Sequence, residues 1–292
     1  MVEKIEGKCW LCGRWARLTR EHIPPRAAFN NHPVLLYSVE QHSAKIGRLE
    51  WAGRVEEGLI VRSLCRECNS RGGGKYGSHY ADFIARVAPA VERAPDGKQI
   101  LISGVRRPLS ILKQVMQSFV SANGPDFVIA NPWIRKFIRN SRNKEWPPSL
   151  FAYIFAMNSS EGRKSGLSAF YDFRRKRIRT VAEFTFWPLG MVVSFDPLDD
   201  YPLTAIHQWA KFDYEWNGQL DITLTVNPVA SAQALDFRTK DEMNRDALRL
   251  EPRPKVPGER LREVMELAQK RGGGSSKDNW AFFTRQTPEI EE

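Results

Sequence analysis

Four cysteines and one glutamate–histidine pair are the residues whose types and spacing could carry chemistry. The cysteines are the only four in 292 residues, and they form two C-x-x-C pairs, Cys9 with Cys12 and Cys65 with Cys68. Two residues between cysteines let both sulfur atoms of a tight turn face one point, and two such turns supply the tetrahedral thiolate shell that zinc prefers. With four protein ligands the shell is closed. We therefore expect a structural zinc that joins two segments with 52 residues between them.

A disulfide framework is the alternative interpretation of these cysteines. The chain shows no export signal and is too long to need disulfide stapling, so we expect reduced thiols and a cytoplasmic protein. No run of about 18 apolar residues occurs, so we expect no membrane span.

The Glu21–His22 pair lies between the two cysteine pairs, in the run L-T-R-E-H-I-P-P. Thr19 and Ile23 favour extended backbone, and each proline restricts the residue before it to extended geometry. We therefore expect His22 at the end of a short strand or in an extended loop, held in place by the zinc turns. From these two residues alone, a surface Glu–His pair is the simpler interpretation.

The complete pattern resembles the HNH nucleases of the ββα-metal fold, in which a zinc-clamped β-hairpin and a helix carry the active site. It consists of C-x-x-C, then E-H-I-P-P, then C-x-x-C-N, and it covers about 70 residues. The resemblance implies that His22 is the general base, that Glu21 helps to hold a divalent metal, and that Asn69 is the metal ligand on the helix. Phosphodiester hydrolysis needs a base near neutral pH and a cation that stabilises developing negative charge. Oxygen ligands such as these suit magnesium or manganese.

One departure from the family concerns the loop between the two halves of the motif. Family members place an asparagine a few residues before the second C-x-x-C pair, where it braces the loop. The run from Glu56 to Cys65 contains no asparagine.

A second departure is the run of three glycines that follows Arg71. Glycine is a poor helix former. We expect the helix that presents Asn69 to be very short, or to begin only after residue 77 with Ser78 as its cap. In the second case His79 or Asp82 would be the metal ligand instead.

The net charge of +10 is concentrated in the first half of the chain. Residues 1–80 carry 13 Lys and Arg against 8 Asp and Glu, and residues 81–150 carry 11 against 5, whereas residues 201–292 carry 13 against 15. This distribution is typical of a protein that binds a phosphate backbone. We expect Arg62, Arg66, Arg71 and Lys75, which surround Asn69, to contact substrate phosphates. A solvated basic loop is the alternative.

We expect an α+β protein, and the length is typical of two compact units. Residues 1–88 would form the zinc-bound HNH unit and residues 89–148 a helical connecting region. Residues 149–238 would form an antiparallel, β-rich accessory domain, and residues 239–292 would form C-terminal helices and a flexible tail. Within that tail, Trp280, Phe282 and Phe283 form an apolar exception that we expect to dock on a partner or on a neighbouring subunit of a homo-oligomer.

Apolar periodicity and cap residues predict the helices of this arrangement. The clearest are Ser78–Val91, Pro108–Asn123 and a helix that starts at Asn131 with a basic outer face. Thr239 and Glu242 form a capping box at the start of a short helix, and 259–270 is predicted to be the last helix. Strands are predicted at Val34–Tyr37, 58–64, 100–103, 150–157, 167–173, 178–186, 191–195 and 222–226.

These observations favour a metal-dependent HNH endonuclease, with DNA preferred over RNA because of the resemblance. The main alternative is a four-cysteine zinc module that binds nucleic acid without cutting it, and a third is a zinc-stabilised protein-interaction scaffold. Bacterial defence and mobile elements are roles known for this class, but no residue in the chain indicates either.

Overall fold

The computed structural model describes residues 5–37, 53–172, 177–230, 233–248, 266–267, 269–271 and 280–285. It combines helices with antiparallel sheets, which agrees with the predicted α+β class. The predicted helix at 259–270 lies outside the described residues, apart from two short helical pieces at 266–267 and 269–270. Within the described part, no helix combines the length and the apolar character that a membrane crossing requires.

The N-terminal unit is a small sheet followed directly by a helix. Strands β1 (Glu6–Lys8), β2 (Trp15–His22) and β5 (Ile60–Cys65) pair in the order β1–β2–β5, and both pairings are antiparallel. Helix α2 (Arg66–Gly72) begins at the residue after β5 and packs against β2 and β5. The predicted strand that leads into the second cysteine pair is confirmed, and His22 is the last residue of β2.

The helix does not stop at the glycine run. Helix α2 continues through a π-helical segment, η1 (Gly73–Gly77), into α3 (Ser78–Val91). The bounds predicted for α3 are confirmed, but Ser78 provides no side-chain cap because the backbone before it is already helical. A larger residue at position 72 would have to displace the Gln117 side chain, since a Cβ there would lie 1.9 Å from Oε1 of Gln117 in the adjacent helix.

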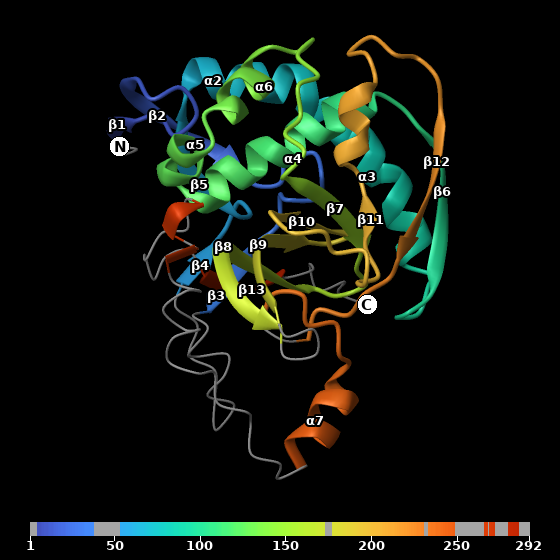
Figure 1. Ribbon diagram of the computed structural model, residues 1–292. Helices are drawn as coiled ribbons and strands as arrows, with labels where there is room; N and C mark the ends of the chain where they lie inside the picture. The colour runs from blue at the N-terminus through green and yellow to red at the C-terminus, as the bar shows by residue number, and fades with distance from the viewer. Residues whose placement is uncertain are drawn as a thin grey trace.

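Helix α4 (Pro108–Asn123) lies at the centre of the molecule, and every one of its residues is buried (Figure 1). Its predicted bounds are confirmed. Two shorter helices follow, α5 (Pro125–Ala130) and α6 (Trp133–Arg139). The ammonium group of Lys113 on α4 donates hydrogen bonds to the carbonyl groups of Phe137, Asn140 and Asn143, so α4 holds the C-terminal end of α6.

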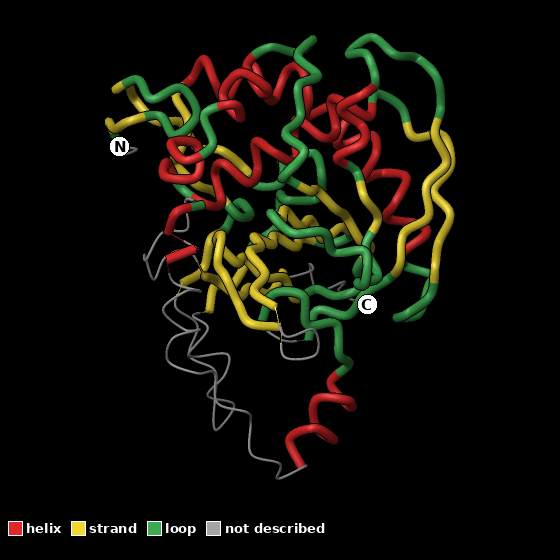
Figure 2. Tube along the Cα trace, in the orientation of Figure 1, coloured by secondary structure: helices red, strands yellow, loops and turns green. Residues whose placement is uncertain are grey.

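An eight-stranded sheet forms the other half of the core, and Figure 2 shows most of the helices gathered on one side of it. The strand order is β11–β7–β10–β9–β8–β13–β3–β4. Alternate residues of a strand point to opposite faces. In β7, Ile154 faces the main core that includes α4, whereas Tyr153 and Phe155 face a second cluster that contains Leu198 and Leu235. The bounds are β7 Phe151–Ala156, β8 Glu161–Asp172, β9 Arg177–Phe186, β10 Leu189–Ser194, β11 Thr204–Ala205, β13 Trp280–Arg285, β3 Val34–Tyr37 and β4 Gly53–Val55.

Strand pairing joins regions that are far apart in the sequence. Strand β13, from the segment expected to be a flexible tail, lies between β8 and β3, so β3 and β4 of the N-terminal region extend the large sheet. Strand β12 (Leu220–Thr225) pairs with β6 (Gln99–Val105) in a separate two-stranded sheet. One main core contains residues from the small N-terminal sheet, from α4 and from the large sheet. The first three predicted regions therefore share one core, and β13 of the fourth region pairs within the large sheet, because strands pair by register and not by closeness in the chain.

Helix α7 (Lys240–Leu248) follows the predicted capping box. The Thr239 hydroxyl donates to Oε2 of Glu242 at 2.9 Å and accepts from the Glu242 N–H at 3.2 Å. This confirms the start of the helix. A short 3₁₀ helix, η2 (His207–Lys211), completes the described helices.

Candidate metal centre and hydrolytic site

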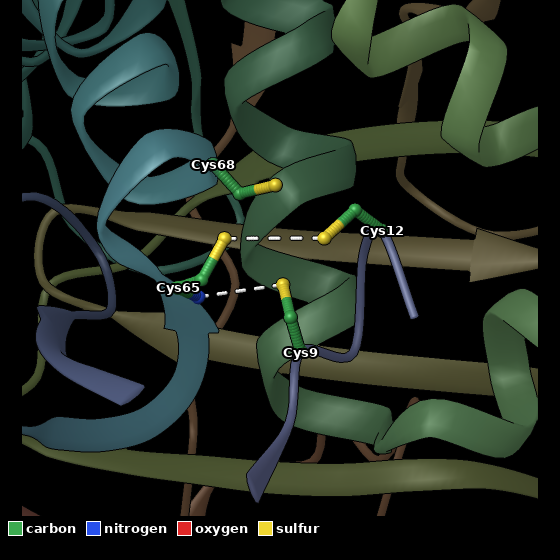
Figure 3. A group of neighbouring side chains, drawn as sticks. All are labelled: Cys9, Cys12, Cys65 and Cys68. Atoms are coloured by element: carbon green, nitrogen blue, oxygen red, sulfur yellow. Dashed lines mark hydrogen bonds between the residues drawn. The ribbon is translucent and has the colours of Figure 1, made fainter. Parts of the chain in front are cut away.

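The four cysteines come together at the end of the small sheet. Cys9 and Cys12 lie on the turn after β1, Cys65 ends β5, and Cys68 lies in the first turn of α2. Their sulfur atoms all lie within 4.8 Å of one another and point toward a common centre (Figure 3). The Cys12 and Cys65 sulfur atoms are 3.9 Å apart, close to the edge of about 3.8 Å of a tetrahedron with Zn–S bonds of about 2.3 Å. The four cysteines are free thiols that could bind a metal such as zinc.

Backbone hydrogen bonds shape the first cysteine turn. The Gly13 N–H donates to the Cys9 carbonyl group at 2.8 Å, and the Cys9 N–H donates to the Arg14 carbonyl group at 2.8 Å. Gly13 has a φ of 77°, in the left-handed region that glycine adopts readily. The Cys65 N–H also points at the Cys9 sulfur atom, at 3.3 Å. Both cysteine turns are therefore prepared to face one ion.

The pKa shifts of the cysteine thiols show how a cation would stabilise this cluster. A hydrogen bond from the Cys68 thiol lowers the pKa of Cys9 to about 4. The pKa of Cys68 is raised, first by that same hydrogen bond and then by burial, and burial raises the pKa of Cys65. Each further thiolate would be repelled by the first one, and a divalent cation removes this repulsion.

His22 lies partly buried at the end of β2, with its ring against the loop that leads to β5. Its Nε2 atom is 3.0 Å from the carbonyl oxygen of Glu57. A carbonyl oxygen can only accept, so Nε2 carries the proton and Nδ1 carries the lone pair. Burial lowers the pKa of His22, the hydrogen bond to the Glu57 carbonyl group opposes this shift, and the nearby cations Arg26 and Arg20 lower the pKa further. The ring is therefore neutral at pH 7 and able to accept a proton.

Glu21 is directed into the interior, toward α4, and only 4% of its surface is exposed. Its Oε2 atom accepts hydrogen bonds from the hydroxyl groups of Ser63 (2.9 Å) and Ser121 (2.5 Å). Its Oε1 atom accepts from Nε2 of Gln117 at 3.0 Å. Burial raises the pKa of Glu21, and the three hydrogen bonds oppose that shift. The carboxyl group thus connects β2 to β5 and to α4.

Asn69 lies on α2 and contacts the backbone of β2. Its Nδ2 atom donates to the Thr19 hydroxyl at 2.9 Å and to the Arg20 carbonyl group at 3.1 Å. Within the described residues, its Oδ1 atom accepts no hydrogen bond, so this oxygen is open to a ligand. The hydrogen-bond partners of Asn69 and those of Glu21 share no residue.

Asn30 braces the loop after His22, a role that the sequence analysis does not assign to it. It is fully buried, and its Nδ2 atom donates to the carbonyl groups of Pro24 (2.8 Å) and Leu59 (2.9 Å). Its Oδ1 atom accepts from the Leu59 N–H at 2.6 Å. Gly58 is needed for this contact, because a Cβ there would lie 2.3 Å from that oxygen. In the sequence Asn30 stands far before the second cysteine pair, and nothing distinguishes it from the loop residue Asn31.

The four predicted phosphate contacts lie in different environments. Arg66 and Lys75 are exposed and Arg62 is partly buried. Arg71 donates to Oε1 of Glu67 at 3.1 Å and to the carbonyl group of Arg139 at 3.3 Å, so it faces α6.

The two alternative metal ligands, His79 and Asp82, lie on α3 away from these contacts. They line a small pocket of about 80 Å³ together with Phe83, Arg86 and Arg106. Burial lowers the pKa of His79, and the charge of Arg107 adds to this effect.

No protein-family model, no curated protein and no solved structure matches this chain. The residues of the site therefore carry the functional argument alone.

Proposed function

We propose that this chain is a metal-dependent endonuclease of HNH type that hydrolyses phosphodiester bonds, with DNA as the favoured substrate. The observation that carries the proposal is the position of His22 at the end of a cysteine-clamped strand, with Nε2 on the Glu57 carbonyl group and a lowered pKa. The order of strand, strand and helix around the four cysteines supports it. The bound metal of the cysteine cluster would be a structural zinc, because all four ligands come from the protein.

In this proposal His22 acts as the general base. Its Nδ1 atom takes a proton from the attacking water, and the Glu57 carbonyl group holds the ring in the required tautomer. Asn30 supports this arrangement because it joins the loop after His22 to Leu59, two residues after Glu57. The base is thus held by backbone contacts at both ends of the loop.

Asn69 offers the open oxygen for the catalytic cation. The Arg20 carbonyl group can only accept, so the amide nitrogen faces β2 and Oδ1 faces away from it. A magnesium or manganese ion at this oxygen would stabilise the charge that develops on the phosphate and on the leaving oxygen. Magnesium commonly completes its shell with water and substrate phosphates, so a single amide oxygen is compatible with it.

Glu21 fits a positioning role better than the ligand role that the resemblance implies. Three hydrogen bonds would have to be exchanged before its carboxyl group could reach an ion beside Asn69. Glutamine at this position can keep hydrogen bonds to Ser63, Ser121 and Gln117. We therefore expect Glu21→Gln to keep its metal dependence and to cut within about tenfold of the wild-type rate. A loss of about 100-fold or more that added magnesium partly restores would assign Glu21 as a ligand.

A second candidate function is a zinc module that binds nucleic acid without cutting it. The burial of Glu21 favours it, because a hydrolytic site of this family is expected to present an acidic oxygen to the metal. In that case His22 takes no part in a reaction, and the basic surface residues alone account for binding.

Plasmid cleavage separates the two candidates. Wild-type protein, His22→Ala and Glu21→Gln would be incubated with plasmid and magnesium or manganese, with zinc content and unfolding midpoint measured for each. We expect the wild type to nick or linearise DNA, and His22→Ala to lose at least about 100-fold in rate, as removal of a general base does, while keeping its zinc. If folded, zinc-loaded wild-type protein cuts neither DNA nor RNA with either metal, the nuclease proposal is wrong.

A further inference from the structure

A basic groove lies between α2 and α6, beside the cysteine cluster. It has a volume of about 370 Å³, and every charged residue that lines it is a cation. The lining residues are Arg71, Pro132, Arg135, Lys136, Arg139 and Asn140. We refer to it as the α2–α6 groove.

Acidic groups compensate only part of the charge beside this groove, and one of them is Glu145, an exposed residue paired with Lys136 at 2.8 Å. Glu67 contacts three guanidinium groups: those of Arg14, of Arg71 at 3.1 Å and of Arg139 at 3.6 Å. One carboxylate therefore serves three cations, and Arg135 adds a fourth guanidinium group whose Nε donates to the Leu11 carbonyl group at 2.9 Å. Glu67 and its partners are each more than a third exposed, so these ion pairs are weak and can exchange for another anion.

The walls of the groove are held before any ligand arrives. The Arg135 contact ties α6 to the first cysteine turn, and Arg71 ties α2 to the last residue of α6. Below them, Lys113 binds the carbonyl groups at the end of α6. A preorganised site loses less free energy to ordering when it binds its ligand.

Helix α2 connects this groove to the proposed hydrolytic site. Asn69 and Arg71 are two residues apart, which turns their side chains by about 200° around the helix. Asn69 contacts β2, and Arg71 contacts α6 on the other side. A helix with its side chains is about 10–12 Å wide, which corresponds to about three nucleotides along one strand of a duplex.

We propose that the α2–α6 groove binds backbone phosphates of a nucleic-acid duplex whose neighbouring nucleotides lie at Asn69. This assignment rests on the nucleic-acid substrate of the proposed function and adds the surface that holds that substrate. Arg139 and Lys136 are its phosphate contacts on α6, and Glu67 beside Arg139 and Glu145 beside Lys136 occupy the positions of anions until the substrate arrives. The contacts are to phosphate, so they hold the duplex in place without reading its sequence.

Salt-dependent binding of a labelled duplex DNA tests this proposal. Anisotropy titrations between about 50 and 200 mM salt would compare wild type with Arg139→Gln, Lys136→Gln and the control Arg245→Gln, which removes the same charge from the exposed helix α7. Each lost phosphate contact lowers the slope of log K against log salt by about 1. We expect this decrease for the two groove variants, with severalfold weaker binding, and no change for the control.

The outcomes separate this proposal from the nuclease proposal. Lys136 is 64% exposed, so its replacement does not endanger folding, and zinc content checks Arg139→Gln. If wild type binds and cuts DNA while both groove variants keep the wild-type slope, the groove proposal is wrong and the nuclease proposal stands. If the slope falls as expected but nothing is cut, the groove stands and the nuclease proposal fails. If wild type binds no duplex at any salt concentration, both are wrong.

Discussion

Glu21 and His22 are neighbours in the chain, yet the fold gives them different environments. His22 lies partly exposed at the end of β2, whereas Glu21 is surrounded by Ser63, Ser121 and Gln117. Successive residues of a strand point to opposite faces, and the Glu21 side chain points toward Gln117 and Ser121 of α4. Burial therefore shifts the pKa of both groups toward the neutral form, since desolvation opposes charge of either sign.

The lowered pKa of His22 predicts the acidic limb of the cleavage profile. A general base works only when it is neutral, so the rate should fall as the pH drops through the pKa of His22, which lies below the ordinary value of 6.5. Removing the charge of Arg26 should raise this pKa. We expect Arg26→Gln to move the acidic limb of kcat/KM to higher pH. The control is Arg17→Gln, which removes a charge at an exposed position of β2, five residues before His22. It should leave the acidic limb at its wild-type pH. An identical limb in all three proteins would contradict the role of His22.

At the scale of elements, the helix continues through the glycine run where it packs against α4. Gly72 lies against Gln117, whose Nε2 atom binds Glu21, whereas Gly73 has no atom within 4 Å of the Cβ position. The glycine run thus contains one position that packing requires and others that face open space. Propensity alone cannot distinguish them, because it treats all glycines in the same way.

This difference predicts opposite effects for two alanine substitutions. Gly72→Ala must displace the buried Gln117 side chain and weaken its bond to Glu21, so we expect a loss of about 1–3 kcal/mol in the free energy of unfolding. Gly73→Ala, in helical backbone with free space, should gain about 0.5–1 kcal/mol. Urea unfolding of both variants measures these changes. Equal effects of the two substitutions would mean that α2 does not approach α4 this closely.

At the scale of the whole molecule, the large sheet connects the two ends of the chain. Strand β13 pairs with β8 from Trp280 to Thr284 and with β3 from Phe282 to Arg285. The aromatic segment expected to dock on a partner therefore lies within the sheet of its own chain. Without β13, the strand pair β3–β4 has no partner in the described part of the sheet.

Truncation tests this connection. A chain that ends at residue 279 lacks β13 and exposes unpaired edges on β8 and β3, so we expect aggregation and fast hydrogen exchange at β3 and β4. Zinc content should stay constant, because the cysteine cluster belongs to a different sheet. A chain that ends at residue 285 keeps the strand and is the control. Unchanged protection of β3 in the shorter chain would contradict the pairing.

The sequence by itself determined the features that depend on short spacing. Two C-x-x-C pairs predict the four-cysteine cluster, and apolar periodicity predicts the bounds of α3 and α4, because a turn or a helix is fixed by residues a few positions apart. Only the tertiary structure decided which groups those elements bring together. The burial of Glu21, the brace at Asn30 and the insertion of β13 all depend on contacts across dozens of residues or more. Such contacts are selected by shared packing and strand register, which leave no local pattern in a single chain.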